Sequence, residues 1–373
     1  MKNIKQLSVK QLAGKTAIVR VDFNVPFKAG KIAETFRIDQ AWPTIDYLLG
    51  KGAKVLLVSH LGDENQSLAP VAKFLNRHRL TKFAPDFKVA RELLLKNNLV
   101  LLENLRIWPG EKSNDKFFVK ELAGLGELYV NDAFSVSHRA HASVVGLPKF
   151  LPSYAGLRLM AEIKNLEQLV KPKLPLLVIL GGAKFKTKIP LLKKLSKADN
   201  IFLGGALANS FFKAQGLGVG QSVVDSDLDY IRPFLKKKNI VLPVDVLVKS
   251  DKGKRFVKKP TEVSKTEAIF DVGPETLKEI TMAAKEARTI LWNGPLGWFE
   301  KGYTKGTLET AKILASTKAF TVVGGGDTLA AIKKLKLENK FGFVSTGGGA
   351  MLDYIASGGK LVGIKVLNVK SNS

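Results

Sequence analysis

Residues 321–334 read TVVGGGDTLAAIKK, an apolar run followed by three glycines, an Asp-Thr pair and a helical pattern. This order is typical of a buried strand that turns tightly into a helix. Gly324, Gly325 and Gly326 would let backbone amides approach an anion, and the positive end of the helix would point at it. Asp327 could hold Mg²⁺ there. The stretch predicts a nucleotide-Mg²⁺ site, and a simple turn with Asp327 as its N-cap is the alternative.

Similar apolar runs recur along the whole chain. They are TAIVRVDFN, KVLLVSHLG, LVLLENLR, ELYVNDAF, PLLVILGG, NIFLGG, TILWNGP and AFTVVGGG. Helical patterns lie between them, for example at 41–49, 70–76, 184–196 and 307–315. The alternation predicts an α/β protein of two doubly wound, Rossmann-like domains with mostly parallel sheets, bilobal and joined by a hinge. Ligands would bind in a central cleft, beyond the carboxyl ends of the strands.

Length and composition support this class. At 373 residues the chain exceeds the usual single core, and a prior of about 150 residues per domain suggests two domains. The absence of cysteine excludes disulfides, thiolate metal sites and a cysteine nucleophile, and suits a cytoplasmic location. The first 16 residues, MKNIKQLSVKQLAGKT, contain no signal-type apolar core. No segment has the roughly 18 apolar residues that a membrane helix needs, so no membrane partner is expected.

The chain is strongly basic, with 59 Lys+Arg against 33 Asp+Glu and a formal charge of +26. Such an excess attracts anionic partners, including nucleic acid. The lysines occur in short scattered runs at 236–238, 258–259 and 333–334, without a basic tail or interleaved aromatic residues. We interpret most of them as solvated helix faces and do not expect a nucleic-acid partner.

The two halves differ in the residues that follow their strands. Before residue 155 these are Arg20, Asp22, Asn24, His60, Arg106, His138 and Arg139, and after it they are mainly glycines and lysines. The first set suits a small acidic substrate, and the second suits nucleotide phosphates. We therefore predict a substrate domain at 1–155, a connecting helix at 156–172 and a nucleotide domain at 173–357.

The common nucleotide motifs GxGxxG and GxxxxGK[ST] are absent. Instead, GGAKFKTK at 181–188 places Lys184 and Lys188 one helical turn apart directly after a strand. A helix N-terminus disfavours cations unless an anion is bound there, which favours a phosphate site. Surface lysines on a first helical turn are the alternative.

Eight motifs follow one another along the chain. They are RVDFNVP at 20–26, SHLG at 59–62, LLENLR at 101–106, NDAFSVSHRAHAS at 131–143, GGAK at 181–184, WNGPLGWFE at 292–300, GGGDT at 324–328 and STGGGA at 345–350. With these motifs the chain resembles the phosphoglycerate kinase family from about Leu12 to Ile364. The resemblance covers almost the whole chain, and the ordered combination is highly specific.

The resemblance implies two ligand sites. The site for 3-phosphoglycerate or 1,3-bisphosphoglycerate would comprise Asp22, Phe23, Asn24, Arg37, His60, Leu61, Gly62, Arg106 and Arg139. The site for ADP or ATP would comprise Lys184, Lys188, Asn293, Pro295, Glu300, Gly325, Gly326, Asp327 and Thr328, with Glu300 on the ribose and Asp327 on Mg²⁺. Taken singly, Glu300 could be a solvated acid and Pro295 a turn former.

The implied reaction is reversible phosphoryl transfer from 1,3-bisphosphoglycerate to ADP on hinge closure, giving 3-phosphoglycerate and ATP. Both possible nucleophiles are already ionised, so positioning and charge stabilisation suffice without a general base. The groups assigned to the transferring phosphoryl are Arg37, Lys184 and the amides of Gly347, Gly348 and Gly349. The family also implies a monomer whose tail, 358–373, packs back on the N-terminal domain.

The chain departs from the family pattern in three of its motifs. Asp63 and Glu64 follow SHLG where the family usually has Arg-Pro, Ser135 replaces a usual glycine, and Phe185 follows GGAK. Because Asp63 puts an anion where a cation is expected, we predict weakened triose binding rather than lost activity.

Two other functions stay open at this point. The chain could be an attenuated family member that binds RNA or another polyanion, or an unrelated ATP-dependent α/β enzyme. The presence of Arg37, Lys184 and Asp327 argues against the first, and the N-terminal Arg/His set argues against the second.

Overall fold

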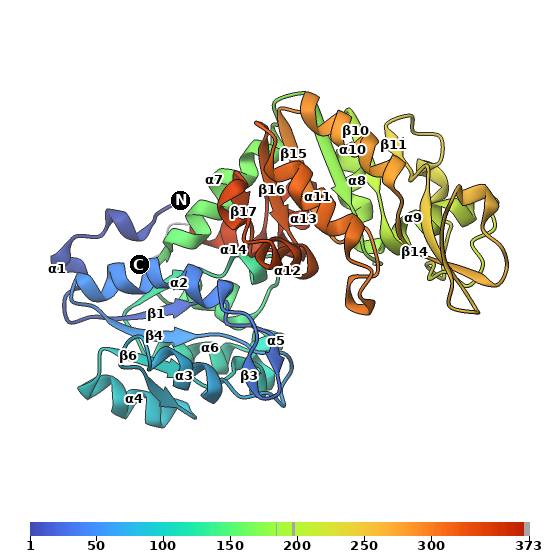
Figure 1. Ribbon diagram of the computed structural model, residues 1–373. Helices are drawn as coiled ribbons and strands as arrows, with labels where there is room; N and C mark the ends of the chain where they lie inside the picture. Colours follow the sequence, from blue (N-terminus) through green and yellow to red (C-terminus); the bar gives the residue numbers. More distant parts are fainter. Residues whose placement is uncertain (184, 196–197, 369–373) are drawn as a thin grey trace. The chain divides into compact units, whose positions relative to one another are not determined.

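The computed structural model describes residues 1–183, 185–195 and 198–368 (Figure 1). The chain forms two compact units. Unit 1 contains Met1–Lys164 together with the C-terminal residues 360–368, and unit 2 contains Asn165–Gly359. The boundary at 164/165 falls inside helix α7 (Leu157–Val170).

Unit 1 is built on a parallel sheet with the order β5-β6-β4-β1-β7-β8. Its strands are β1 (Thr16–Arg20), β4 (Lys54–Val58), β5 (Lys82–Ala84), β6 (Leu99–Leu102), β7 (Leu128–Asn131) and β8 (Ser153–Ala155). A short hairpin of β2 (Phe27–Lys28) and β3 (Lys31–Ile32) follows β1. The helices are α1 (Val9–Leu12), α2 (Phe36–Gly50), α3 (Ala69–Leu75), α4 (Phe87–Lys96), α5 (Pro109–Ser113), α6 (Lys116–Ala123) and α14 (Val362–Lys365).

Both faces of this sheet are buried. Val19 and Leu57 share one core with Ile45 of α2 and Val71 of α3. Successive strand residues point to opposite faces, so the equally buried Ile18 and Leu56 face the other side. Strands covered on both faces read as continuous apolar runs, as the sequence does here.

Unit 2 repeats the design with the parallel order β11-β10-β9-β15-β16-β17. Its strands are β9 (Leu176–Leu180), β10 (Asn200–Leu203), β11 (Ile240–Val241), β15 (Thr289–Asn293), β16 (Phe320–Gly324) and β17 (Phe343–Val344). The helices are α8 (Ile189–Lys194), α9 (Gly205–Ala214), α10 (Pro274–Glu286), α11 (Lys305–Ala315), α12 (Gly326–Lys334) and α13 (Gly349–Ala356). The predicted α/β class with two mostly parallel sheets is confirmed.

Unit 2 also carries an antiparallel sheet that the sequence patterns did not predict. Its strands are β12 (Val246–Ser250), β13 (Arg255–Lys258) and β14 (Glu267–Val272), in the order β13-β12-β14. The helix predicted at 184–196 lies partly outside the described residues. Within them a 3-10 turn at Lys186–Lys188 precedes α8, whose second residue, Pro190, suits a first helical turn.

The first turn of α7 is anchored in unit 1. Asp132 Oδ1 accepts hydrogen bonds from the amides of Arg158 at 2.8 Å and Leu159 at 3.2 Å. The Thr44 side chain also holds this turn, because its Oγ1 accepts a hydrogen bond from the Leu157 amide at 2.9 Å. Burial raises the pKa of Asp132 to about 6, and its hydrogen bonds with the Thr44 side chain and with the Leu159 and Arg158 amides oppose the rise.

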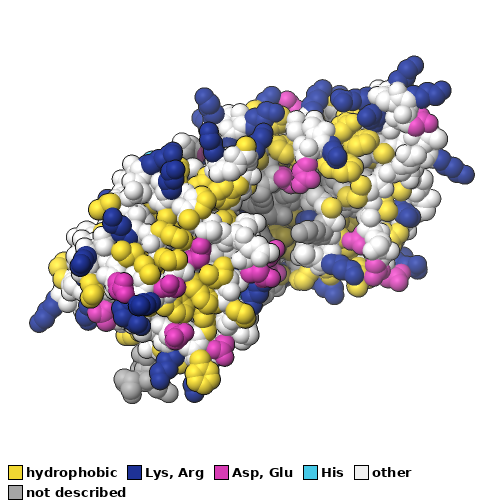
Figure 2. Space-filling view, turned by 90° about the horizontal axis from the view of Figure 1, so that it is seen from below, with side chains coloured by type: hydrophobic (Ala, Val, Ile, Leu, Met, Phe, Trp, Pro, Cys, Tyr) yellow, Lys and Arg dark blue, Asp and Glu magenta, His cyan; other side chains and the backbone are white. Residues whose placement is uncertain are grey.

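Charged side chains are dispersed over the face seen in Figure 2. Figure 2 shows Lys and Arg side chains spread over the visible face, with acidic and apolar side chains between them. No described helix combines the length and the apolar character needed to cross a bilayer.

Candidate functional site

The predicted triose-site residues meet at the carboxyl edge of the sheet in unit 1. Asp22 follows β1, His60 follows β4 and Arg106 follows β6. These three strands are neighbours in the parallel order β6-β4-β1, so their ends open on the same edge.

Hydrogen bonds connect several of these residues to one another. Arg37 Nη1 lies 3.3 Å from Asp22 Oδ2 and donates to the Asn24 carbonyl at 2.8 Å. Asn24 Oδ1 accepts from the Gly62 amide at 2.9 Å. Arg106 Nη1 donates in turn to the Gly62 carbonyl. The side chains of this edge are therefore held in place by their neighbours.

Phe23 and Leu61 are scaffolding, with exposed fractions of 0% and 3%. The Leu61 amide donates to Asn104 Oδ1 at 3.1 Å. Asn104 Nδ2 lies within hydrogen-bonding distance of three carbonyls, those of Leu61 at 2.8 Å, Asp63 at 2.9 Å and Gln66 at 2.7 Å. Sequence reasoning missed Asn104, although its position in the LLENLR motif was a usable signal.

Arg20 faces inward, contrary to the expectation that it grips a ligand. Its side chain is 1% exposed, and its Nε donates to Ser143 Oγ at 2.9 Å. Ser143 donates to the buried Glu111 through both Oγ, at 2.6 Å, and its backbone amide, at 2.9 Å. Glu111 supplies the anion that a buried guanidinium requires, so Arg20 supports the site from within the core.

Arg20 also determines the protonation of His60. Arg20 Nη2 lies 3.1 Å from His60 Nδ1, and because a guanidinium can only donate, Nδ1 must accept. The ring proton therefore resides on Nε2. Burial lowers the pKa of His60 well below its usual value, and Arg20, Arg106, Arg139 and Arg37 lower it further. His60 is a neutral hydrogen-bond donor, not a cation.

The edge concentrates positive charge. Burial lowers the pKa of Arg106, and Arg139 and then Arg20 lower it further. Burial and the neighbouring arginines likewise lower the pKa of His141 to about 4. Arg106 Nε is buried and has no hydrogen-bond partner among the described residues. Guanidinium groups that repel one another in this way favour an anionic ligand.

Asp63 and Ser135, which depart from the family pattern, both lie next to predicted site residues of this edge. The Asp63 side chain is 84% exposed, and its Oδ1 lies 4.0 Å from Nη1 of Arg106, whose own side chain is 10% exposed. Ser135 Oγ donates to Asp22 Oδ2 at 2.5 Å, a hydrogen bond that glycine could not make. Ser135 thus adds a further constraint on Asp22.

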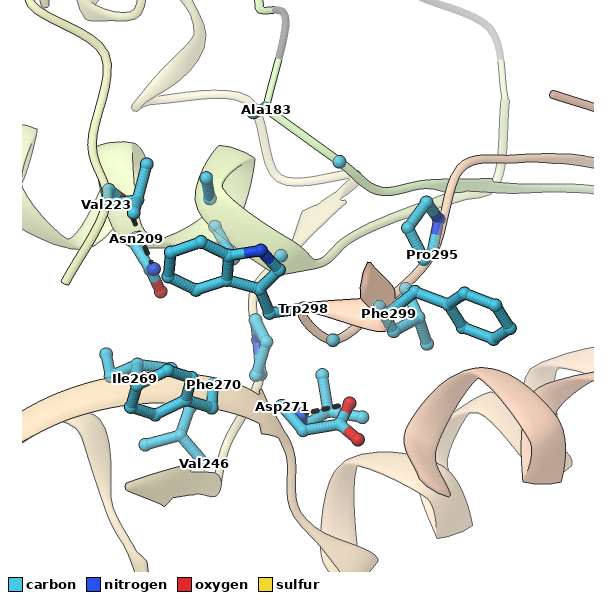
Figure 3. A pocket seen from close by; sticks show the side chains of 18 of the residues that line it. Ala183, Asn209, Val223, Val246, Ile269, Phe270, Asp271, Pro295, Trp298 and Phe299 are labelled. Atoms are coloured by element: carbon cyan, nitrogen blue, oxygen red, sulfur yellow. Dashed lines mark hydrogen bonds between the residues drawn. The ribbon is translucent and has the colours of Figure 1, made fainter. Parts of the chain in front are cut away.

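Unit 2 contains a cavity of about 310 Å³ (Figure 3). Its walls include the turn after β9, the first turns of α9, the antiparallel sheet and the segment after β15. Three predicted nucleotide residues line it, namely Pro295, Glu300 and Asp327. The remainder of the wall is largely apolar and aromatic, as is usual for small-molecule sites.

Close backbone contacts shape the glycine turns beside this cavity. A side chain on Gly181 would collide with the Pro295 carbonyl, so glycine is required there. Gly325 has φ +102° and is the N-cap of α12. Thr328 Oγ1 accepts from the Gly294 amide at 2.9 Å, and Asn293 Nδ2 donates to the Gly324 carbonyl at 3.0 Å. Asn293 and Thr328 therefore tie β15 to the glycine turn of α12.

Asp327 lies in the first turn of α12. Burial raises its pKa, and the nearby Glu300 raises it further. The described residues include no group of three or more His, Cys, Asp or Glu side chains able to hold a metal alone. A single carboxylate beside a phosphate site fits Mg²⁺, which commonly takes one or two carboxylates and the phosphates of its ligand.

The sequence predicts two lysines, Lys184 and Lys188, for this site. Lys184 lies outside the described residues. Lys188 is 5% exposed, and its Nζ would lie 3.8 Å from a Cβ on Gly182, so it faces the turn after β9. Phe185 is fully buried and meets Phe211 edge-on at 5.7 Å between ring centroids, which accounts for the aromatic residue there.

The predicted amide donors lie apart from this cavity. Gly348 has φ +50° and is the N-cap of α13, and a Cβ on Gly348 or Gly349 would meet only open space. Gly347 donates its amide to Ser345 Oγ at 3.0 Å. Within the described residues, Gly347, Gly348 and Gly349 are not part of the cavity wall.

The two units define a two-domain α/β protein with a cluster of arginines at the edge of one parallel sheet and a cavity beside the other. The phosphoglycerate kinase family model matches residues 4–358. Phosphoglycerate kinase from Coprothermobacter proteolyticus is 42% identical over 98% of this chain and 99% of its own length, and that of Borrelia garinii is 41% identical over 98% and 99%. The chain belongs to the phosphoglycerate kinase family.

Solved structures agree. The phosphoglycerate kinase of Pyrococcus horikoshii has a TM-score of 0.88 at 30% identity, with 98% of both chains covered. That of Coxiella burnetii has a TM-score of 0.83 at 36% identity, with 99% of both chains covered. The family assignment therefore holds for the fold of the whole chain as well as for its motifs.

Proposed function

We propose that this chain catalyses reversible phosphoryl transfer between 1,3-bisphosphoglycerate and ADP, giving 3-phosphoglycerate and ATP. The observation that carries the proposal is the pairing of two different sites. A cluster of arginines and a neutral histidine suits a small phosphorylated acid in unit 1. An apolar cavity beside a glycine turn suits a nucleotide in unit 2.

The triose acid binds in unit 1 through charge-assisted hydrogen bonds. Arg37, Arg106 and Arg139 supply the positive charge for its phosphates and carboxylate. His60 donates through Nε2, and Asp22 and Asn24 accept from the substrate hydroxyl. Hydrogen bonds already hold the Arg37 and Arg106 side chains in place. These side chains therefore lose little conformational freedom when the substrate binds.

ADP binds in unit 2 with its phosphates at the glycine turn of α12 and near Lys184 and Lys188. Glu300 would hold the ribose, and Asp327 would hold a Mg²⁺ ion. An ion held there would neutralise phosphate charge. Asp327 would then ionise more readily, because a cation opposes the effects that raise its pKa.

Transfer requires the two ligands to meet in line, so we propose that the units close about α7, which contains the boundary between them. Arg37, Lys184 and the amides of Gly347–Gly349 then stabilise the transferring group. Closure also excludes water that would hydrolyse the acyl phosphate. No general base is needed, since the attacking oxygen is already ionised. We further propose that the enzyme is a cytoplasmic monomer.

A coupled assay of ATP formation from 1,3-bisphosphoglycerate, ADP and Mg²⁺ tests the function. Arg37→Met should lower kcat/KM by about 100-fold or more, because the variant loses a donor to the transferring group. Arg91→Met, which removes an exposed arginine of α4, is the control and should keep full activity. Absence of ATP formation by the unmodified chain would refute the proposed activity.

A further inference from the structure

Asn209 of α9 has one half of its amide satisfied and the other half unsatisfied. The residue is 3% exposed. Its Nδ2 donates to the Val223 carbonyl at 3.2 Å. Its Oδ1 is buried and has no hydrogen-bond partner among the described residues. A carbonyl can only accept, so the bond to Val223 fixes Nδ2 on that side and directs Oδ1 the other way. A buried acceptor without a partner is unfavourable unless a ligand completes it.

The position of Asn209 in the cavity indicates which part of a ligand it meets. Gly205 and Ala206 line the cavity from the first turn of α9, and Asn209 follows one turn later. In Figure 3, Pro295 lies at one end of the pocket, while Asn209 and Val223 lie at the other. The first end contains the glycine turns suited to phosphates, so the base of a bound nucleotide would reach the Asn209 end.

The Asn209 end otherwise offers apolar and aromatic surface. Val246, Ile269 and Phe270 come from the antiparallel sheet, and the Trp298 indole lies beside the Asn209 amide (Figure 3). Trp298 and Phe270 are stacked, with ring centroids 5.8 Å apart and planes 19° apart. Such walls accept the face of any base, so they do not select among bases.

We propose that Asn209 is a specificity-determining residue whose Oδ1 accepts a hydrogen bond from the exocyclic 6-amino group of adenine. The inference rests on the proposed function, because it assigns a base contact within the same nucleotide site. A purine without that amino group leaves Oδ1 unpaired on binding. A site that hydrogen-bonds a ligand N–H discriminates strongly against an analogue that lacks it.

Calorimetric binding of ADP and of purine riboside 5′-diphosphate to the full chain tests the proposal. The two ligands differ only in the amino group. The unmodified chain should bind ADP at least about tenfold more tightly. Asn209→Leu, similar in size but without an acceptor, should bind the two ligands within about twofold of each other. Lys213→Leu, on the exposed side of the same helix, should keep the unmodified chain's preference.

Equal affinity of the unmodified chain for the two ligands would overturn the role of Asn209, and this measurement does not depend on the folding of any variant. A tenfold preference retained by Asn209→Leu would overturn it as well. Failure of ADP itself to bind would instead remove the proposed function, so the two failures are distinguishable.

Discussion

The edge of the sheet in unit 1 and the cavity of unit 2 are built in different ways. In unit 1, polar and charged side chains hold one another, as Arg37 holds Asp22 and Arg20 holds the neutral His60. In unit 2, glycine turns and helix N-termini face the site, and apolar side chains form most of the wall. Fixed side-chain cations suit a small ligand with several charges, whereas backbone amides and an apolar wall suit a nucleotide.

A site that is built from several charged side chains needs compensating charge deeper in its domain. Several arginines close together repel one another, and Arg20 is fully buried. Glu111, linked to Arg20 through Ser143, compensates this charge from inside. The acid beside the cavity of unit 2, Asp271, accepts instead from the backbone amides of Gly306 and Val272, both at 2.9 Å.

Removing Glu111 should have the largest effect. Glu111→Ala leaves Arg20 buried without its anion, and we expect the free energy of unfolding to fall by about 3 to 5 kcal/mol. Urea unfolding followed by tryptophan fluorescence and circular dichroism measures the change. The matched variant in unit 2, Glu300→Ala, removes an exposed acid and should change stability by less than about 0.5 kcal/mol. Equal losses in the two variants would remove the distinction between the sites.

The buried acid of unit 2 should make stability depend on pH. Burial raises the pKa of Asp271 to about 6 in the folded chain, above its ordinary value of 3.8. The folded state therefore binds a proton more tightly than the unfolded state, and the resulting stability is lost as pH rises through 6. Asp271→Asn cannot ionise, so from pH 5 to pH 7.5 it should gain about 1 kcal/mol relative to the unmodified chain. A constant difference over that range would show that Asp271 does not titrate there.

Asp63 should have the smallest effect, because it is exposed and solvent screens its charge. Asp63→Asn should lower the KM for the triose substrate by about two- to fivefold at low salt, since Arg106 loses a competing anion. The gain should disappear in about 0.5 M salt. The neighbour Glu64 pairs with Lys112 at 2.9 Å, so Glu64→Gln is the control and should leave KM unchanged. An unchanged KM in Asp63→Asn would mean that the aspartate is neutral for binding.

The sequence could indicate which residues follow the strands of both sheets, because the end of each parallel strand is marked by a change from apolar to polar residues. It could not predict that Arg20 turns inward, since the residues that receive it, Ser143 and His60, are distant in the chain. Asn104 was missed for a similar reason. Its side chain acts on the loop after β4, some 40 residues earlier, and only folding brings the two together.

The antiparallel sheet of unit 2 escaped prediction because β13 is mostly exposed and has no continuous apolar run. Its partners β12 and β14 contribute Val246, Ile269 and Phe270 to the cavity. The aromatic end of the cavity therefore depends on a sheet whose edge strand has only a weak sequence pattern.

The sequence by itself determined the α/β class, the residues at the strand ends and the glycines of the turns, because these depend on local periodicity and on backbone conformation. Only the tertiary structure decided how those residues act. Partners far apart in the chain made His60 a neutral donor, buried Arg20 against the Glu111 network and left Asn209 Oδ1 without a partner. Hydrogen bonding and burial depend on contacts in space, which local sequence does not encode.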